Sequence, residues 1–334
     1  MKTATVNGPG LETIRLVELD EQAVPAGHVR LKIKAASLNY RDLFVAKGYM
    51  PIPYPQIILS DAMGEVIELG AGVTRVAPGD RVFATYYPDW IEGAATPQKV
   101  ARDRGGIHPG VAAETIVVPE NDLVKIPAFL SDAEVATLPC AALTGWSCVT
   151  RNVSLKPGTS VLVQGTGGVA LFALQFAKAA GAEVFLISSS DAKLERAGEL
   201  GADHLINYRT TEAWDEVVLQ KTGGRGVDVV VELGSEATFA RSMNCVAIDG
   251  HISQAGILGG MSVPMPVYLL MTKLVHIDGI MTGSRDNAEA MVRAIEQNGI
   301  RPVLDKSFGL DEIPAALTHM ESGSHFGKVT IAIG

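Results

Sequence analysis

The sequence is poor in cysteine, and its three cysteines are widely scattered (Cys140, Cys148 and Cys245). An odd, sparse set argues against a disulfide framework and for a reducing compartment. It also falls short of the four closely spaced thiolates that a structural zinc lobe needs. The histidines are scattered too, without the paired spacing of a metal site.

Further absences narrow the class of protein. No block of Lys or Arg stands out in a chain of net charge −9, which argues against a nucleic-acid partner. The longest apolar runs, such as Val267–Met271, are far too short to span a bilayer. The N-terminal segment lacks the apolar stretch of a signal peptide. We therefore expect a cytoplasmic protein with neither nucleic acid nor membrane as a partner.

What the chain does contain is the composition of a well-packed enzyme. It has 334 residues, 47% hydrophobic and 19% charged, and this length favours two domains. Residues 1–125 carry short apolar or alternating runs between Gly, Pro and Asp turns, which predicts a small β-barrel. Within them, residues 86–110 form a long polar segment that we expect to be an irregular loop.

Beyond Lys125 the pattern changes to alternating strands and helices. Strands are predicted at 161–163, 184–187, 227–232 and 251–255, and helices at 141–150, 169–180 and 192–200. Ser131-Asp132-Ala133-Glu134 is expected to cap a further helix. This alternation is typical of a doubly wound parallel sheet with right-handed crossovers. A helix at 287–298 and a strand at 328–333 follow, and we place this tail with the first domain. The expected domains are thus 1–125 with 285–334, and 126–284.

The most specific motif is Gln164-Gly165-Thr166-Gly167-Gly168-Val169-Ala170. It follows a β-branched run and opens a helical pattern, the arrangement that offers helix N–H groups to a dinucleotide pyrophosphate. Gly165 permits the tight turn, and Gly167 lets the backbone approach the phosphates. Ala170, in place of a third glycine, is small enough for the helix to pack on the sheet. The motif predicts a nicotinamide cofactor.

The end of the next predicted strand bears on which nicotinamide cofactor binds. NAD-specific folds place a carboxylate there, but this chain has Ser188, Ser189 and Ser190, followed by Lys193. Hydroxyls and an ammonium suit the 2′-phosphate of NADPH. Asp191 offers a competing interpretation, because it can bind the ribose of NADH. Alternatively, Ser190 and Asp191 only cap the following helix. The pattern favours NADPH, with NADH possible.

Several motifs, in order along nearly the whole chain, resemble those of medium-chain dehydrogenases/reductases. They are Ala35-Ala36-Ser37-Leu38-Asn39-Tyr40-Arg41-Asp42, Ser60-Asp61-Ala62-Met63-Gly64-Glu65-Val66, Val76–Val82, Ala141–Trp146, Gly201-Ala202-Asp203 and Ile206-Asn207-Tyr208. The resemblance implies a GroES-like β-barrel catalytic domain and a Rossmann cofactor domain, and so an α/β fold. Within the superfamily, the chain is most similar to the zinc-free quinone oxidoreductase-like branch.

The assignment to the zinc-free branch rests on positions where this sequence differs from the zinc enzymes of the superfamily. Asn39 stands where they have a ligand Cys, and Asp61 stands where they have the His of Gly-His-Glu. Cys140 matches the third ligand but has lost these partners, and a lone Cys is more typical of a small buried hydrophobe. We therefore expect no zinc.

Without a Lewis acid, the reduction of a simple ketone lacks a group that stabilises the alkoxide. Quinones and enones delocalise the incoming charge, and the resemblance points to such small electrophilic substrates. We expect hydride transfer from nicotinamide C4 to a conjugated carbonyl, with the proton coming from water or a nearby hydroxyl. Two alternatives remain open at this point: a zinc-free alcohol or carbonyl oxidoreductase, and a cofactor-binding protein with little turnover.

The resemblance also implies roles for individual residues. Asn39 and Asp42 belong to the segment that lines the nicotinamide site, although local turn chemistry is an equal alternative for both. Residues implied in cofactor binding, besides the glycine motif and the serines, are Thr144, Lys193, Tyr208, Gly256, Met281 and Thr282.

Two further expectations concern Tyr49 and the assembly. Related reductases often carry Gly-x-Tyr, whose tyrosine donates a proton or hydrogen bond, but in Gly48-Tyr49 the tyrosine comes one position early. Tyr49 is therefore a candidate proton donor, with simple packing as the alternative. The apolar strand 276–281 would lie at a sheet edge, and exposed edges usually need cover, so we expect a homodimer.

Overall fold

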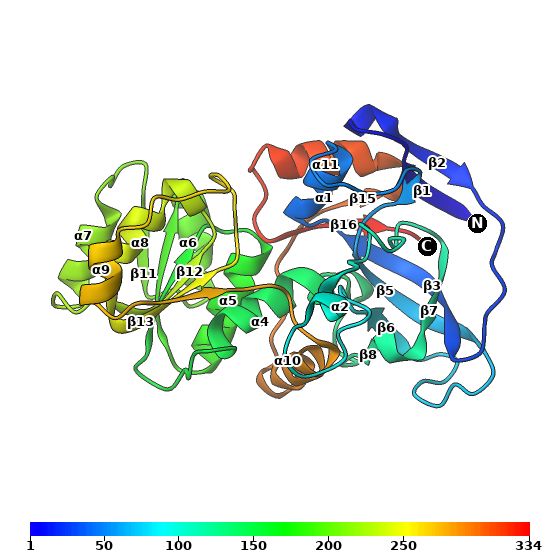
Figure 1. The fold of residues 1–334 in the computed structure, drawn as a ribbon, viewed down its shortest axis with the longest axis horizontal. Coiled ribbons are helices and arrows are strands. Elements are labelled where there is room, and N and C mark those ends of the chain that lie inside the picture. The colour runs from blue at the N-terminus through cyan, green and yellow to red at the C-terminus, as the bar shows by residue number, and fades with distance from the viewer. The chain divides into compact units, whose positions relative to one another are not determined.

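The computed structural model describes residues 1–334 and divides into two compact units (Figure 1). Unit 1 comprises Met1–Leu143 and Thr282–Gly334, and unit 2 comprises Thr144–Met281. The division therefore falls after residue 143 rather than at the expected 125/126, and after residue 281 rather than 284. The reason is packing: residues 126–143 lie against the strands of unit 1, where the Ser37 hydroxyl donates to the Ala136 carbonyl at 2.9 Å.

Unit 1 is built on two sheets. A seven-stranded sheet has the order β15-β16-β3-β5-β6-β8, with β7 also paired to β3, and a three-stranded sheet has the order β2-β1-β4. Pairing is antiparallel except between β15 and β16. The strands are β1 (Lys2–Val6), β2 (Ile14–Glu18), β3 (His28–Ser37), β4 (Gln56–Ile57), β5 (Asp61–Leu69), β6 (Arg81–Ala84), β7 (Thr115–Pro119), β8 (Leu123–Lys125), β15 (Leu304–Gly309) and β16 (Lys328–Ala332).

The C-terminal tail returns to this unit, as expected. Strand β16 pairs with β3 through Thr330 and Ser37, so the last strand lies beside one of the first. The helices of unit 1 are α1 (Tyr40–Ala46), α2 (Pro97–Val100), α3 (Asp132–Val135), α10 (Arg285–Asn298) and α11 (Ile313–Glu321), with a π-turn at Leu138–Ala142. Ser131 caps α3, as predicted. Helix α10 begins at Arg285, two residues before the expected 287, and Ser284 caps it.

Unit 2 is a six-stranded parallel sheet of order β11-β10-β9-β12-β13-β14, which confirms the predicted Rossmann architecture. Its strands are β9 (Ser160–Gln164), β10 (Glu183–Ser188), β11 (His204–Asn207), β12 (Val227–Glu232), β13 (Val246–Gln254) and β14 (His276–Gly279). Strand β9 is buried along its whole length, as a central strand covered on both faces should be.

The helices of unit 2 are α4 (Leu143–Thr150, which starts at the last residue of unit 1), α5 (Gly168–Ala179), α6 (Asp191–Glu199), α7 (Trp214–Lys221), α8 (Phe239–Cys245) and α9 (Val267–Thr272). Helix α5 buries the apolar face that its spacing predicts, including Ala170, Phe172 and Phe176. None of the helices has the length and apolar character needed to cross a bilayer.

Candidate active site

The glycine motif forms the predicted strand–turn–helix in unit 2. Gly165 takes a left-handed backbone conformation (φ 79°) directly after β9, and its N–H donates to the Ile187 carbonyl at 2.7 Å. A Cβ at Gly165 would meet no atom within 4 Å, so only the backbone conformation requires glycine there. Gly167 precedes the first residue of α5 without a side-chain cap. The turn thus leaves the N–H groups of the first turn of α5 for a ligand, as a dinucleotide site requires.

The other predicted cofactor residues of unit 2 mostly follow the ends of its strands. Ser188 is the last residue of β10, Tyr208 follows β11, Gly256 follows β13, and Met281 follows β14. Because all six strands are parallel, these positions share the carboxyl edge of the sheet with Gly165, which is where such folds bind ligands. Thr144 lies buried on α4, and Thr282 belongs to unit 1.

The serines at the end of β10 differ in their contacts and burial. The Ser190 hydroxyl accepts the Lys193 N–H at 3.4 Å and caps α6, so the capping alternative describes this residue. Asp191 accepts a hydrogen bond from the Asn207 side chain at 2.7 Å. Ser188 is buried, Ser189 is half-buried and Tyr208 is exposed. Lys193 is half-buried.

A buried polar network, which the sequence analysis missed, holds the loop after β12 to the glycine motif. Gln164 donates to Glu232 at 2.7 Å and to Ser242 at 2.8 Å, and its carbonyl accepts the N–H groups of Leu233 and Gly234. Glu232 itself is fully buried. The network ties β9, β12 and α8 together immediately beside the dinucleotide turn.

Gly256 is held against this same loop. A Cβ at Gly256 would lie 2.4 Å from the Leu233 carbonyl oxygen, so any side chain would force the two segments apart. The Gly256 N–H also donates to the Glu232 carbonyl at 3.2 Å. The glycine is thus required by close backbone approach, whatever it contributes to cofactor binding.

In unit 1, Asn39 and Asp42 lie where β3 gives way to α1. The Asp42 carboxylate accepts the Asn39 backbone N–H at 2.7 Å and lies 3.3 Å from the Arg41 guanidinium. Asp42 therefore caps α1 and fixes the Asn39 backbone, which agrees with the turn-chemistry interpretation for Asp42. Burial raises the pKa of Asp42 to about 6, although Arg41 opposes the shift.

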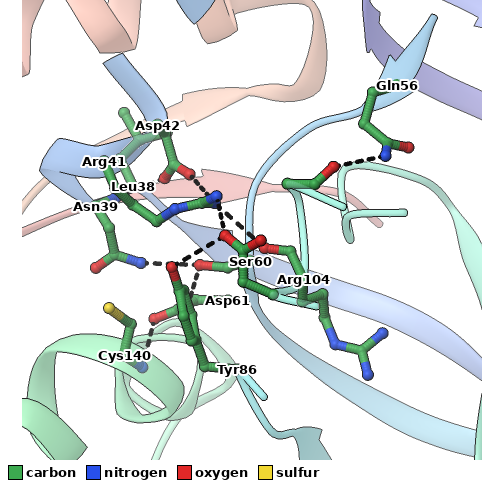
Figure 2. A network of polar contacts seen from close by, with 12 residues as sticks. Leu38, Asn39, Arg41, Asp42, Gln56, Ser60, Asp61, Tyr86, Arg104 and Cys140 are labelled. Atoms are coloured by element: carbon green, nitrogen blue, oxygen red, sulfur yellow. Dashed lines mark hydrogen bonds and ion pairs between the residues drawn. The ribbon is translucent and has the colours of Figure 1, made fainter. Parts of the chain in front are cut away.

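The Asn39 side chain belongs to a buried chain of hydrogen bonds, part of which Figure 2 shows. Lys328 donates to Asn39 Oδ1 at 2.6 Å, and Asn39 Nδ2 donates to the Ser60 hydroxyl at 3.2 Å. Ser60 donates to Asp61 Oδ1 at 2.5 Å, and the Cys140 N–H donates to Asp61 Oδ2 at 3.0 Å. The chain joins four segments that are distant in sequence, at β3, β5, β16 and the π-turn.

The two charged ends of this chain are almost completely shielded from water. Asp61 is 0% exposed and Lys328 is 3% exposed. Burial raises the pKa of Asp61, while Lys328 and Ser60 lower it. Burial also lowers the pKa of Lys328, against the attraction of Asp61. An ammonium and a carboxylate in one buried cluster compensate each other's charge.

The tyrosines near this cluster differ in role. Tyr86 and Tyr87 are buried and pack with Trp90, so these aromatics anchor the 86–110 loop rather than cover a substrate. The Tyr86 hydroxyl donates to Asp103 at 3.3 Å. Tyr49 is 65% exposed and packs at a tilted angle against Phe44, and its hydroxyl has no hydrogen-bond partner. The structure therefore places Tyr49 outside the buried network.

The side chains at the positions that match zinc ligands are already engaged. Both Asp61 oxygens accept hydrogen bonds, and the Asn39 oxygen accepts from the Lys328 ammonium. Burial, with Asp61 adding to it, raises the pKa of the Cys140 thiol. An amide whose oxygen faces a buried ammonium, and a carboxylate whose two oxygens both accept hydrogen bonds, do not fit a zinc ion.

Comparison with known proteins supports both halves of the architecture. Residues 25–128 match the model of the alcohol dehydrogenase GroES-like domain. Residues 168–297 match the model described as zinc-binding dehydrogenase.

Full-length relatives cover nearly the whole chain. The zinc-type alcohol dehydrogenase-like protein C1773.06c of Schizosaccharomyces pombe is 40% identical, over 93% of this chain and 92% of its own. Acryloyl-coenzyme A reductase of Metallosphaera sedula is 28% identical, over 99% of both chains. Among solved structures, a provisionally assigned alcohol dehydrogenase from Sinorhizobium meliloti 1021 has a TM-score of 0.94 and 41% identity, covering 99% of this chain and 98% of that one.

Proposed function

Because the chain belongs to the medium-chain dehydrogenase/reductase superfamily, and is therefore an NAD(P)-dependent oxidoreductase, we propose that it reduces a conjugated carbonyl without zinc. The acceptor would be a quinone, an enone or an α,β-unsaturated thioester. Unit 2 would bind the cofactor, and the Asn39 network of unit 1 would bind the acceptor's carbonyl.

One observation carries this proposal: the side chains at the positions that match zinc ligands are engaged in hydrogen bonds, with a buried ammonium beside them. A delocalised enolate needs less stabilisation than a localised alkoxide, so hydrogen-bond donors can suffice for the enolate, whereas the alkoxide needs a stronger electrophile. The similarity to acryloyl-coenzyme A reductase supports a conjugated acceptor, because that protein is named for an unsaturated thioester. When bound, the nicotinamide supplies the hydride, and the protein's part is to orient the acceptor and to stabilise charge on its oxygen.

A substrate panel tests the proposal. Oxidation of NADPH and NADH is followed at 340 nm (the usual nicotinamide band) with a quinone, an enone, an unsaturated thioester and a saturated aldehyde. We expect turnover with at least one conjugated acceptor and little with the aldehyde. Turnover with the aldehyde alone would favour the alcohol or carbonyl oxidoreductase instead, and tight cofactor binding with no turnover would favour a binding protein.

We further propose that NADPH is the preferred cofactor and that Lys193, Ser189 and Tyr208 hold its 2′-phosphate. The proximity of Ser189 and Tyr208 in the fold supports this assignment, because the Tyr208 N–H donates to the Ser188 carbonyl at 3.1 Å. Asp191 is the residue that opposes it, since a nearby carboxylate repels a phosphate. Dissociation constants measured by fluorescence titration decide whether NADPH or NADH is the preferred cofactor.

The protein is also proposed to be a homodimer that pairs through β14. This strand is the last of the parallel sheet, so its outer edge has no partner within the chain. Large exposed apolar side chains lie in its neighbourhood in sequence, including Tyr268 and Met271 on α9 and Leu274 in the turn before β14. Light scattering should give twice the mass of the 35.2 kDa chain, and Ile277→Pro should give the monomer mass. A wild-type monomer would contradict this assembly.

A further inference from the structure

Unit 1 contains a cleft that is separate from the predicted cofactor residues and from the Asn39 network. It has a volume of about 320 Å³ and lies where α10 packs against β8, next to the loop that joins β5 to β6 (Figure 1). All of its lining residues belong to unit 1. Sites for small ligands have volumes of about 300–1,000 Å³, so the cleft is large enough for a small organic molecule.

The floor of this cleft is apolar. Val76 comes from the loop between β5 and β6, Leu123 from β8 and Val292 from α10, and each is at most 8% exposed. The apolar part of a ligand that rests on this floor is removed from water, which favours binding in proportion to the area that is covered.

The rim of the cleft is mainly cationic. Lys125 follows Leu123 by two positions on β8, so both side chains lie on one face of the strand. Glu289 and Arg293 are four positions apart on α10, so they lie on one face of the helix. Arg75, from the loop, completes the rim. Three cations and one carboxylate thus line a cleft in a chain whose net charge is −9.

The carboxylates at the cleft already have cationic partners. Glu289 binds the Arg75 guanidinium, and one of its oxygens lies 3.5 Å from Arg285 Nε. Asp80 lies 2.8 Å from the Lys125 ammonium. Neither carboxylate therefore leaves an uncompensated negative charge that would repel an anionic ligand.

Two guanidinium groups at the rim have N–H donors to spare. Arg293 is exposed, and its side chain makes neither a hydrogen bond nor an ion pair within the protein. Arg75 is held in place, because its Nε and Nη2 donate to the Leu123 carbonyl at 3.4 Å, while its Nη1 has no partner. The cleft thus presents one fixed and one free guanidinium above an apolar floor.

We propose that this cleft binds a small monocarboxylate with an apolar body. The carboxylate accepts hydrogen bonds from Arg293 and Arg75, and the apolar body rests on the floor. Guanidinium groups match the geometry of carboxylates, and Arg75 already binds one in Glu289. A phosphate monoester carries more negative charge, so Glu289 repels it more strongly than a carboxylate. The site is independent of the reaction proposed above.

NMR titration with defined probes tests the chemistry of the ligand. We expect hexanoate to bind about tenfold more tightly than acetate, because its four additional CH2 groups lie half-covered on the floor. Hexan-1-ol, which lacks the charge, and inorganic phosphate, which lacks the apolar body, should both bind more weakly than hexanoate. No binding of hexanoate, or equal affinities for hexanoate, acetate and phosphate, would overturn the proposal.

Arg293→Met tests the free guanidinium. It should weaken hexanoate about fivefold, the effect expected of an ion pair at an exposed site. Arg209→Met is the matched control, because Arg209 is an exposed arginine of unit 2 whose side chain also has no partner. Its affinity for hexanoate should equal that of wild type. Equal losses in the two variants, or no loss in Arg293→Met, would refute the site.

Glu289→Gln should change the affinity in the opposite direction, which a folding defect cannot mimic. The uncharged glutamine no longer engages Arg75 as an ion pair, so the guanidinium is released to the ligand. We expect hexanoate to bind about fivefold more tightly. Glu199→Gln, at an exposed position on α6, is the control and should match wild type. An unchanged or lower affinity in Glu289→Gln would contradict the proposed site.

The location of the bound probe is read from methyl signals. In protein with ¹³C-labelled valine methyl groups, the Val292 signals are identified by their loss in Val292→Ile. We expect them to shift as hexanoate is added, in step with the binding curve, and to shift less in Arg293→Met at the same concentration. Val292 signals that stay in place at saturating hexanoate would put the ligand elsewhere and overturn the proposal.

Discussion

Each unit buries a polar network, and the two networks are built on different principles. In unit 2, Glu232 accepts hydrogen bonds from five donors, and all five are neutral: Gln164, Gly234, Ser235, Thr238 and Ser242. In unit 1, a chain of neutral groups runs from the Lys328 ammonium to the Asp61 carboxylate. Two of the donors to Glu232 are backbone N–H groups, so that network fixes a loop. The chain of hydrogen bonds in unit 1 fixes the direction of one amide, because the Asn39 oxygen accepts from Lys328 and its NH2 group donates to Ser60.

The comparison teaches that burial of a carboxylate does not by itself indicate a role in catalysis. A carboxylate satisfied wholly by neutral donors holds backbone in place, and here it holds the loop beside the dinucleotide turn. A buried ion pair with a polar chain between its charges creates an oriented field, which can act on a ligand. On this view, substitutions in the hydrogen-bonded chain of unit 1 should impair turnover. Substitutions in the Glu232 network of unit 2 should impair stability and cofactor binding.

The largest effect on turnover is expected from Asn39→Ala. Loss of the amide that joins Lys328 to Ser60 in the proposed acceptor site should lower kcat about a hundredfold or more with a conjugated acceptor, and leave the cofactor dissociation constant within about twofold. Steady-state kinetics and fluorescence titration measure the two quantities. Asn298→Ala, at the exposed end of α10, is the control and should match wild type. A kcat within threefold of wild type in Asn39→Ala would remove this residue from the reaction.

Asp42 should make stability depend on pH in unit 1. Its pKa is raised from 3.8 to about 6 in the folded protein, so the folded state holds the proton more tightly than the unfolded chain. Stability is therefore greatest below pH 3.8 and is lost as pH rises to about 6, by up to about 3 kcal/mol. Urea unfolding from pH 4 to pH 7 should show this decline in wild type. Burial also raises the pKa of Asp122 to about 6, so that carboxyl adds a decline of its own. Asp42→Asn, which keeps an acceptor for the Asn39 N–H, should therefore show a smaller decline than wild type, and equal declines in both proteins would refute the assignment.

Glu232→Gln tests the network of unit 2. In either orientation, the new NH2 group faces at least one N–H donor, from Gln164 or from the Gly234 and Ser235 backbone, so unfolding free energy should fall by about 2 kcal/mol. Because Gly256 lies against the displaced loop, cofactor affinity should fall as well, while kcat at saturating cofactor stays near wild type. Glu216→Gln, at an exposed position on α7, should change neither quantity. A loss of kcat with intact cofactor affinity would reverse the roles that we assign to the two networks.

Lys193→Ala addresses the cofactor end of unit 2. Loss of an ammonium that binds the 2′-phosphate should weaken NADPH by about 1.5–3 kcal/mol and leave NADH nearly unchanged. The exposed Lys221→Ala is the control. If both cofactors lose affinity equally, Lys193 does not recognise the phosphate.

The smallest effect is expected from Tyr49→Phe. The Tyr49 hydroxyl makes no hydrogen bond and lies outside the unit 1 network, so turnover should stay within about twofold of wild type. Steady-state kinetics with the best acceptor of the panel measure it. A tenfold loss would restore Tyr49 as a proton donor.

Local sequence patterns predicted unit 2 well, because its features are local. The turn at Gly165, the cap at Ser190 and the apolar face of α5 each depend on residues within about ten positions of one another. The role of Glu232 could not be predicted from local patterns, because its partners come from three separate segments. Its position at the end of a buried strand was the available signal.

The chain of hydrogen bonds in unit 1 was predictable only in part. Asn39 and Asp61 stood out as departures from a ligand pattern, but nothing local connects them with Lys328, 289 positions away from Asn39. Only the pairing of β16 with β3 brings the ammonium there. A lysine that opens an apolar strand, Lys328-Val329-Thr330-Ile331-Ala332, was the one sequence signal of an inward-facing charge.

The central claim is that the protein reduces a conjugated acceptor without a metal. Its most direct test is the rate of NADPH oxidation with the best conjugated acceptor, measured before and after exhaustive chelation, with zinc determined in the same samples by mass spectrometry. The account predicts an unchanged rate in protein that holds far less than one zinc per chain. A rate that falls on chelation and returns with stoichiometric zinc would contradict it.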